Sequence, residues 1–249
     1  MKPAELLQRT GHRTWPPPAR PWSQRQSWLD LLFAHWPVDA DAVRELLPAG
    51  LELDLFEGQA WLGVLPFHMQ GIRFRSLPLL PGTSAFAELN VRTYVRATRG
   101  PGIWFFSLDA AHALAVAVAR RWYHLPYFRA RMSSEGDGEA VRYRSTRTHR
   151  GAPAAELAAE YAPSGAVEPA RPGTLEHWLV ERYRLYARHG SRILEGEVHH
   201  DPWPLQKAVA SFRRNTMAAA SGLRLPDVQP VLHFSRRLDV LVWSPQSVG

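Results

Sequence analysis

The feature of this sequence that most constrains its fold is a series of short segments in which two kinds of side chain alternate. The clearest covers residues 86–97. One set of alternate positions holds Leu89, Val91, Thr93, Val95 and Ala97, and the other holds Glu88, Asn90, Arg92, Tyr94 and Arg96. A period of two residues is typical of a β-strand. Similar segments predict strands at 51–55, 60–67, 103–108, 140–148, 192–199 and 231–243. Many short strands and few helices predict an α+β fold that is mainly antiparallel β, as a barrel or sandwich with accessory helices.

Helices and loops are expected between these strands. The pattern predicts a short helix over 39–47 and a longer one over 175–188 that Thr174 caps. Asp109 is expected to cap an alanine-rich helix over 110–122, because its side chain can accept hydrogen bonds from the free amides of the first turn. Glu57 and Gly58 predict a hairpin turn between the strands at 51–55 and 60–67. Proline, glycine and alanine predict loops over 75–82 and 151–173.

The first 21 residues differ from the rest. They are basic, and Pro16–Pro18 favour an extended backbone, so residues 1–21 are predicted to form an extended basic arm ahead of a single domain over 22–249. Such an arm either packs across the domain or binds an anionic partner. The most apolar helical segment, residues 110–119, is shorter than the ~20 residues that cross a membrane. We expect no membrane association and a cytoplasmic protein.

Composition restricts the chemistry. Cysteine is absent, which excludes disulfides, thiol nucleophiles and thiolate metal sites. Arginine supplies nearly all of the positive charge behind the net +7, and the lysines are Lys2 and Lys207. The adjacent histidines His199 and His200 would point to opposite faces of a strand, so they do not predict a metal site. No nucleotide-binding or serine-hydrolase motif occurs, and we predict no cofactor.

Seven strings in order carry a resemblance to a known family. They are FAHWPV at 33–38, AWLGVLPFHM at 60–69, ELNVRTYV at 88–95, WFFSLDA at 104–110, RRWYHLPYFRARM at 120–132, ERYRLY at 181–186 and HHDPWPL at 199–205. Over residues 28–245 the chain resembles the YqjF-like family of bacterial proteins, in the acetoacetate decarboxylase-like superfamily. The resemblance implies an antiparallel β-barrel or cone around an interior pocket, with short helices outside.

The resemblance also bears on the reaction. Acetoacetate decarboxylase uses a lysine amine that condenses with a ketone to form a Schiff base. In the matching stretch here, Tyr127 takes the position of that lysine and Phe128 the position of its neighbour. Neither side chain can form an imine, and Lys207 lies in another element. Schiff-base decarboxylation is therefore not expected, and whether the protein is an enzyme stays open.

The resemblance assigns candidate site residues. Phe86-Ala87-Glu88 matches a motif that carries an active-site glutamate, so Glu88 is a candidate catalytic residue. Arg92 and Tyr94 share its strand face and are candidate substrate-binding residues. If that face points inward, the interior is charged, which is costly unless the charged groups are paired or bind a ligand. If it points outward, the alternation is that of an ordinary solvent-facing strand.

Further candidates follow the expected helix at 110–122. Arg121 is a candidate anion-binding residue, because a guanidinium can hold a carboxylate through two hydrogen bonds; the alternative is a structural ion pair. Tyr127 and His124 are candidate catalytic acids or bases, and Tyr123 is a candidate substrate-binding residue. The alternative for these three is aromatic packing over the mouth of the barrel.

Three functional hypotheses result. The first is binding of a small carboxylate or keto-type metabolite in the barrel, with acid–base rather than Schiff-base chemistry. The second is a non-catalytic module that binds or senses a small ligand. The third is a structural or nucleic-acid-binding protein with a solid interior that uses surface arginines. The third is disfavoured, because Arg142 and Arg144 lie on one face of their predicted strand and Arg147 on the other. A homo-oligomer is compatible with the sequence.

Overall fold

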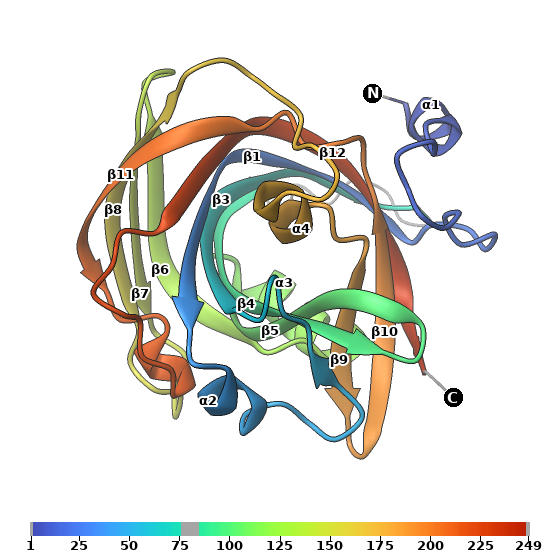
Figure 1. Ribbon diagram of the computed structural model, residues 1–249, viewed down its shortest axis with the longest axis horizontal. Coiled ribbons are helices and arrows are strands. Elements are labelled where there is room, and N and C mark those ends of the chain that lie inside the picture. Colours follow the sequence, from blue (N-terminus) through green and yellow to red (C-terminus); the bar gives the residue numbers. More distant parts are fainter. Residues whose placement is uncertain (1, 76–84, 248–249) are drawn as a thin grey trace.

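The computed structural model describes residues 2–75 and 85–247, and within them the chain forms one mixed sheet with short helices at its ends and edges (Figure 1). The twelve strands described are β1 (Gln24–Val38), β2 (Glu52–Leu53), β3 (Ala60–Phe74), β4 (Ala85–Ala97), β5 (Gly100–Ala110), β6 (Tyr127–Gly136), β7 (Val141–Arg147), β8 (Glu156–Ser164), β9 (Arg184–His189), β10 (Arg192–His199), β11 (Gln206–Asn215) and β12 (Val231–Ser247). The helices are α1 (Pro3–Gln8), α2 (Ala40–Arg44), α3 (Ala113–Val118) with a π-helical turn at Ala119–Tyr123, α4 (Leu175–Val180) and a 3-10 turn at Ala219–Ser221. The expected α+β class is confirmed. The sheet is mainly antiparallel, with β5 running parallel to both β6 and β9. No helix among these residues is long and apolar enough to cross a membrane.

The strand pairings form two closed circuits that share a wall. Following the pairings from β12 through β1, β3, β4, β5, β9 and β10 leads back to β12. A second path leaves β5 through β6, β7, β8 and β11 and also returns to β12. Two hydrophobic clusters correspond to the two circuits, and strands β1, β3, β4 and β5 contribute to both.

Strand β4 lies in this shared wall, which explains its alternation. Leu89 and Val91 pack into the cluster enclosed by β7, β8 and β11, whereas Phe86 and Tyr94 face the other cluster. Both faces are buried, and Glu88 is only 3% exposed. The solvent-facing interpretation of the Glu88 face is therefore wrong. The two alternating sets of side chains on β4 therefore face two different buried cores. In a solvent-facing strand, one of the two sets would face water.

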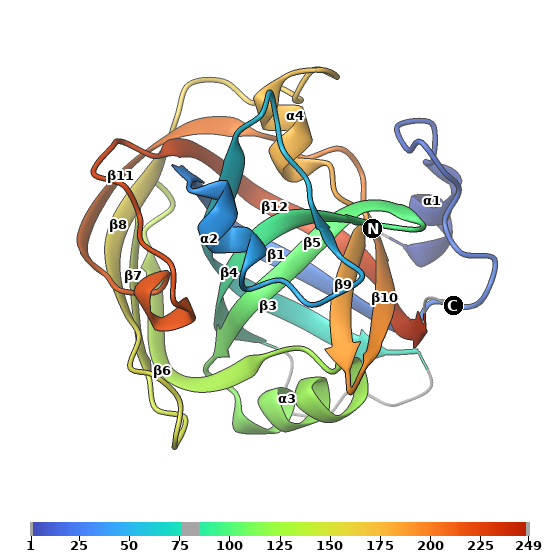
Figure 2. The same ribbon diagram turned by 60° about the horizontal axis from the view of Figure 1, so that its bottom comes forward.

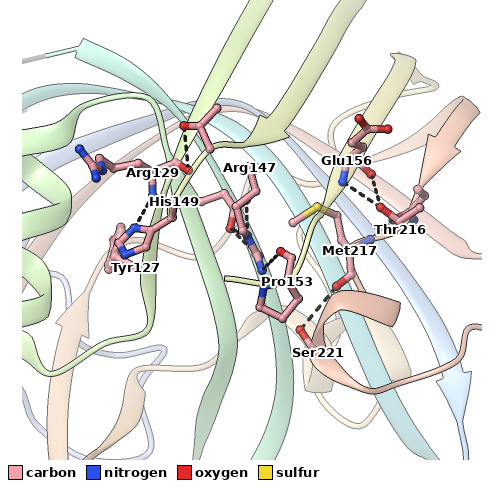
Figure 3. Close-up of polar contacts among 12 residues, drawn as sticks. Tyr127, Arg129, Arg147, His149, Pro153, Glu156, Thr216, Met217 and Ser221 are labelled. Atoms are coloured by element: carbon pink, nitrogen blue, oxygen red, sulfur yellow. Dashed lines mark hydrogen bonds and ion pairs between the residues drawn. The ribbon is translucent and has the colours of Figure 1, made fainter. Parts of the chain in front are cut away.

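Several predicted elements need correction. The loop expected over 151–173 contains β8, whose Leu157 and Tyr161 are buried in the second cluster. Its first residue is held by Thr216, because the Glu156 amide donates to Thr216 Oγ1 at 2.8 Å (Figure 3). The helix expected over 175–188 begins at the Thr174 cap but ends at Val180, and β9 follows. Strands β1, β6, β9 and β11 were also not predicted.

Two local predictions around β2 and β5 are also wrong. Asp109 does not cap a helix, since it is a buried residue of β5 that forms an ion pair with Arg147. The cap of α3 is His112, whose Nδ1 accepts from the Ala115 amide. The strand expected at 51–55 is reduced to β2, which pairs with β4. The predicted turn at Glu57 and Gly58 is present, because Phe56 and Gln59 exchange two backbone hydrogen bonds across it, but β2 and β3 do not pair with each other. Most of the loop expected at 75–82 lies outside the described residues.

The N-terminal segment packs against the domain. Its first residues form α1, so the segment is not extended throughout. Arg13 reaches Glu197 of β10 at 3.2 Å and lies over the Tyr183 ring. The Leu6 carbonyl is 2.9 Å from Nε2 of His199. Figures 1 and 2 show the segment beside strands β10 and β12. Its charges are therefore used largely within the molecule.

Candidate functional site

The first circuit encloses a cavity of about 210 Å³. All seven strands of that circuit contribute to its lining, together with the first residue of β6. Helix α3 covers one end and the segment that follows α4 covers the other, and the two helices lie at opposite ends of the sheet in Figure 2. The lining is mainly apolar. Its polar members include Glu88, Asn90, Arg92, Tyr123, Tyr127 and Arg182.

Glu88 and Tyr127 form a hydrogen-bonded pair in this cavity. Strand β5 brings them together, because Glu88 pairs with Ala110 of β5 and Tyr127 pairs with Leu108. The Tyr127 hydroxyl donates to Glu88 Oε2 at 3.0 Å. Burial raises the pKa of Glu88 to about 8, against the opposing effect of this hydrogen bond. Burial and the neighbouring carboxylate hold the pKa of Tyr127 well above its usual value. The carboxyl group is thus largely protonated at neutral pH.

Arg92 lies farther along the same face of β4, near α4. Its guanidinium donates to the Leu179 carbonyl at 3.1 Å, and the residue is 7% exposed. Within residues 2–75 and 85–247, no carboxylate lies within 4.0 Å of it, and its Nε has no hydrogen-bond partner. By contrast, the neighbouring Arg182 is paired with Asp54 at 2.8 Å. In the described part of the chain, Arg92 is a buried cation without a carboxylate counter-ion.

The candidate residues Tyr94 and Tyr123 differ in their position relative to the cavity. The Tyr94 hydroxyl donates to the Leu179 carbonyl at 2.9 Å and lies 2.7 Å from Nε2 of His35. Tyr94 is fully buried but does not line the cavity. Tyr123 does line it, and its hydroxyl is 3.2 Å from that of Ser23. Tyr94 therefore positions α4, whereas Tyr123 can contact a ligand.

The placements expected for Arg121 and His124 are corrected. Arg121 is exposed, and His124 stacks on His189 with ring centroids 3.9 Å apart; neither lines the cavity. The local reason is the π-helical turn that ends the α3 region, followed by a left-handed backbone at His124. This turn directs Tyr123 into the cavity and leaves Arg121 and His124 outside.

Some lining residues were not predicted. The sequence predicted a helix over the segment that contains Arg182, so no pattern indicated that its side chain lines the cavity. His199 and His200 point to opposite sides, as expected: His199 faces α1, and His200 lines the cavity with its pKa lowered by burial to about 3. No group of three potential metal ligands occurs among the described residues. Lys207 is exposed on β11, away from the cavity lining.

Comparisons with known proteins agree with this architecture. Residues 25–239 match the family DUF2071, described as an uncharacterized conserved protein. The chain is 48% identical over 222 residues to the uncharacterized protein YqjF of Bacillus subtilis (strain 168), covering 89% of this chain and 91% of that protein.

Solved structures show the same fold at low sequence identity. Acetoacetate decarboxylase from Legionella pneumophila matches with a TM-score of 0.62 and 12% identity, over 96% of this chain and 93% of that chain. The enduracididine biosynthesis enzyme MppR, complexed with the condensation product of pyruvate and imidazole 4-carboxaldehyde, matches with a TM-score of 0.62 and 13% identity, over 95% and 92%. The acetoacetate decarboxylase-like fold expected from the resemblance is confirmed. The chain belongs to the YqjF-like family DUF2071.

Proposed function

We propose that the protein binds a small carboxylate or keto-type metabolite in the cavity and moves a proton on it without forming a Schiff base. The observation that carries the proposal is the Glu88–Tyr127 pair inside a cavity that also holds the unpaired Arg92. An acid–base group and an anion-binding group on one wall are what such chemistry requires.

The acid–base role follows from the pKa of Glu88. A carboxyl group whose pKa is about 8 exchanges its proton near neutral pH, so it can act as an acid or, after deprotonation, as a base. The Tyr127 hydroxyl stabilises the carboxylate form, because it donates a hydrogen bond to Oε2. Enolisation beside a ketone, or hydration and dehydration, would use such a pair.

The absence of an amine at this site separates the proposal from decarboxylation through an imine. Tyr127 stands where the resemblance places the lysine, and no lysine lines the cavity within the described part of the chain. MppR has been solved with pyruvate, a small keto acid, which supports the ligand class only through a shared fold. The non-catalytic module of the second hypothesis would have the same cavity.

The test separates binding from proton transfer. Thermal shift with a panel of small organic and keto acids reports binding, and proton NMR in deuterated buffer reports exchange at the carbon next to the ketone. We expect stabilisation by at least one acid, and exchange that Glu88→Gln abolishes while binding survives. Arg144→Gln, an exposed arginine on β7, is the control. Binding with no exchange would leave the non-catalytic module. No stabilisation by any acid would overturn the proposal.

A further inference from the structure

The two ends of the cavity differ, and the order of the residues along β4 shows how. The Phe86 end of β4 lies at α3, because the Phe86 ring stacks on His112 and the Ala111 amide donates to the Ala87 carbonyl. The Arg92 end lies at α4, where Arg92 donates to the Leu179 carbonyl. Successive lining positions of this strand are therefore an aromatic ring, a carboxyl group, an amide and a guanidinium.

The α4 end is closed and positively charged. Arg92, Val180, Arg182 and Trp203 line it, and all four are buried. Asp54 is already shared by Arg182 and Arg96, at 2.8 and 2.7 Å. Glu181 accepts hydrogen bonds from the Tyr183 hydroxyl and the Trp203 amide. A buried guanidinium without a counter-ion is costly, and an anionic ligand group would remove that cost.

Among the described residues, the α3 end is open and mainly apolar. Leu114 lines the cavity and is 53% exposed, so the cavity reaches the surface beside it. The apolar lining near this end includes Met69, Ile72, Phe74, Phe86, Ala115 and Val118. The apolar part of this lining gains free energy by covering hydrocarbon. The polar side chains beside it, Gln24, His112 and Tyr123, include no arginine or lysine that would hold a second carboxylate.

We propose that the ligand is an amphipathic monocarboxylate whose carboxylate binds Arg92 at the closed end and whose apolar tail extends toward α3. This inference rests on the proposed function and names its substrate class. Residues 88 and 92 are four positions apart, which places their α-carbons roughly 13 Å apart on an extended strand. The Arg92 guanidinium is held toward α4, so a three-carbon acid bound there does not reach Glu88. A longer acid whose keto group lies several carbons from its carboxylate brings that group beside Glu88 and Tyr127, where the proposed proton transfer takes place.

Chain length is the property that tests this orientation in the unmodified protein. Each additional buried methylene contributes about 0.8 kcal/mol, which is about a fourfold change in Kd. Isothermal titration with straight-chain 2-oxo acids, from pyruvate to 2-oxodecanoate, should show Kd falling by about that factor per carbon until the tail reaches solvent. Methyl ketones of matched length, which lack the carboxylate, should bind at least about thirtyfold more weakly.

Two variants locate the ends of the ligand. Arg92→Gln should reduce the preference for the acid over the matched ketone, with Arg144→Gln as the control. Ala115→Phe, at the mouth, should remove the gain for long chains and leave short acids unaffected. If Arg92→Gln does not fold, the chain-length series and the ketone comparison still decide. Tight pyruvate binding with no gain from longer chains would overturn this inference and keep the proposed function. No binding by any acid would overturn both.

Discussion

Two buried sites with ionisable side chains, one on each side of β5, differ in whether these side chains have charged partners. Arg147 of β7 and Asp109 of β5 form a closed pair: Nε and Nη2 of the arginine donate to both carboxylate oxygens at 2.7–3.1 Å. The same guanidinium also reaches the Pro153 carbonyl (Figure 3). Glu88 and Arg92 are equally buried, yet neither has a charged partner among the described residues. The first site is complete within the protein, whereas the second leaves Arg92 free for the ligand proposed above.

This difference separates structure from function more clearly than burial does. A buried ion pair whose two charges match is costly to break, but its charged groups need neither water nor a ligand as a partner. A buried arginine without a counter-ion and a buried carboxyl group that is held protonated both reduce stability, and such groups are concentrated at functional sites. The following predictions test the contrast.

Breaking the closed pair should have the largest effect. Asp109→Ala leaves Arg147 buried without a counter-ion and should lower the free energy of unfolding by about 3–5 kcal/mol. The double variant Asp109→Leu with Arg147→Met should recover most of that loss. Urea denaturation at pH 7 measures both. Arg142→Ala is the control, since its contact with Glu160 is 3.8 Å and exposed, and it should cost less than about 1 kcal/mol. Equal losses in the buried and exposed sites would contradict the contrast.

Glu88→Gln should change how stability depends on pH. The pKa of Glu88 is about 8 in the folded protein and is raised from about 4.5, so the folded state holds a proton that the unfolded state releases between these values. Relative to the variant, the wild type should therefore lose stability as pH rises, by about 1.4 kcal/mol per pH unit between about pH 5.5 and 7.5. Urea denaturation at several pH values measures the difference. Parallel pH profiles would show that the carboxyl group ionises normally.

Tyr127→Phe should raise the pKa of Glu88 further. The hydroxyl stabilises the carboxylate form, so its loss favours the protonated form by about one pKa unit or more. Infrared difference spectra of the carboxyl stretch, titrated with pH and assigned by Glu88→Gln, measure the shift. A lowered pKa would mean that Tyr127 does not stabilise the carboxylate.

Arg121→Gln should have the smallest effect. The side chain is exposed and outside the cavity, so stability and ligand affinity should each change by less than about 0.5 kcal/mol. Denaturation and titration with the best-binding acid measure the two quantities, and Arg92→Gln provides the contrast. A large loss of affinity in Arg121→Gln would restore it as an anion-binding residue.

Much of the fold was accessible from periodicity. The alternation in residues 86–97 predicted β4, and similar patterns predicted β5, β7, β10 and β12 within a few residues. The segment at 151–173 misled, because its alanines and prolines resemble a loop while Leu157, Ala159 and Tyr161 face a core. The segment at 181–186 misled in the opposite direction, because it was predicted as part of the helix over 175–188, whereas α4 ends at Val180 and Arg184–His189 form β9.

The sequence by itself determined the side-chain chemistry of this protein: no thiol, no lysine where the resemblance places one, and a glutamate, a tyrosine and several arginines in recognisable strings. It also determined which residues share a face of β4. Only the tertiary structure decided that both faces are interior, that Tyr127 meets Glu88 across β5, and that Arg92 rather than Arg121 lies in the cavity. The physical reason is that alternation along a strand records two different environments, whereas the contacts across strands depend on how the sheet closes on itself.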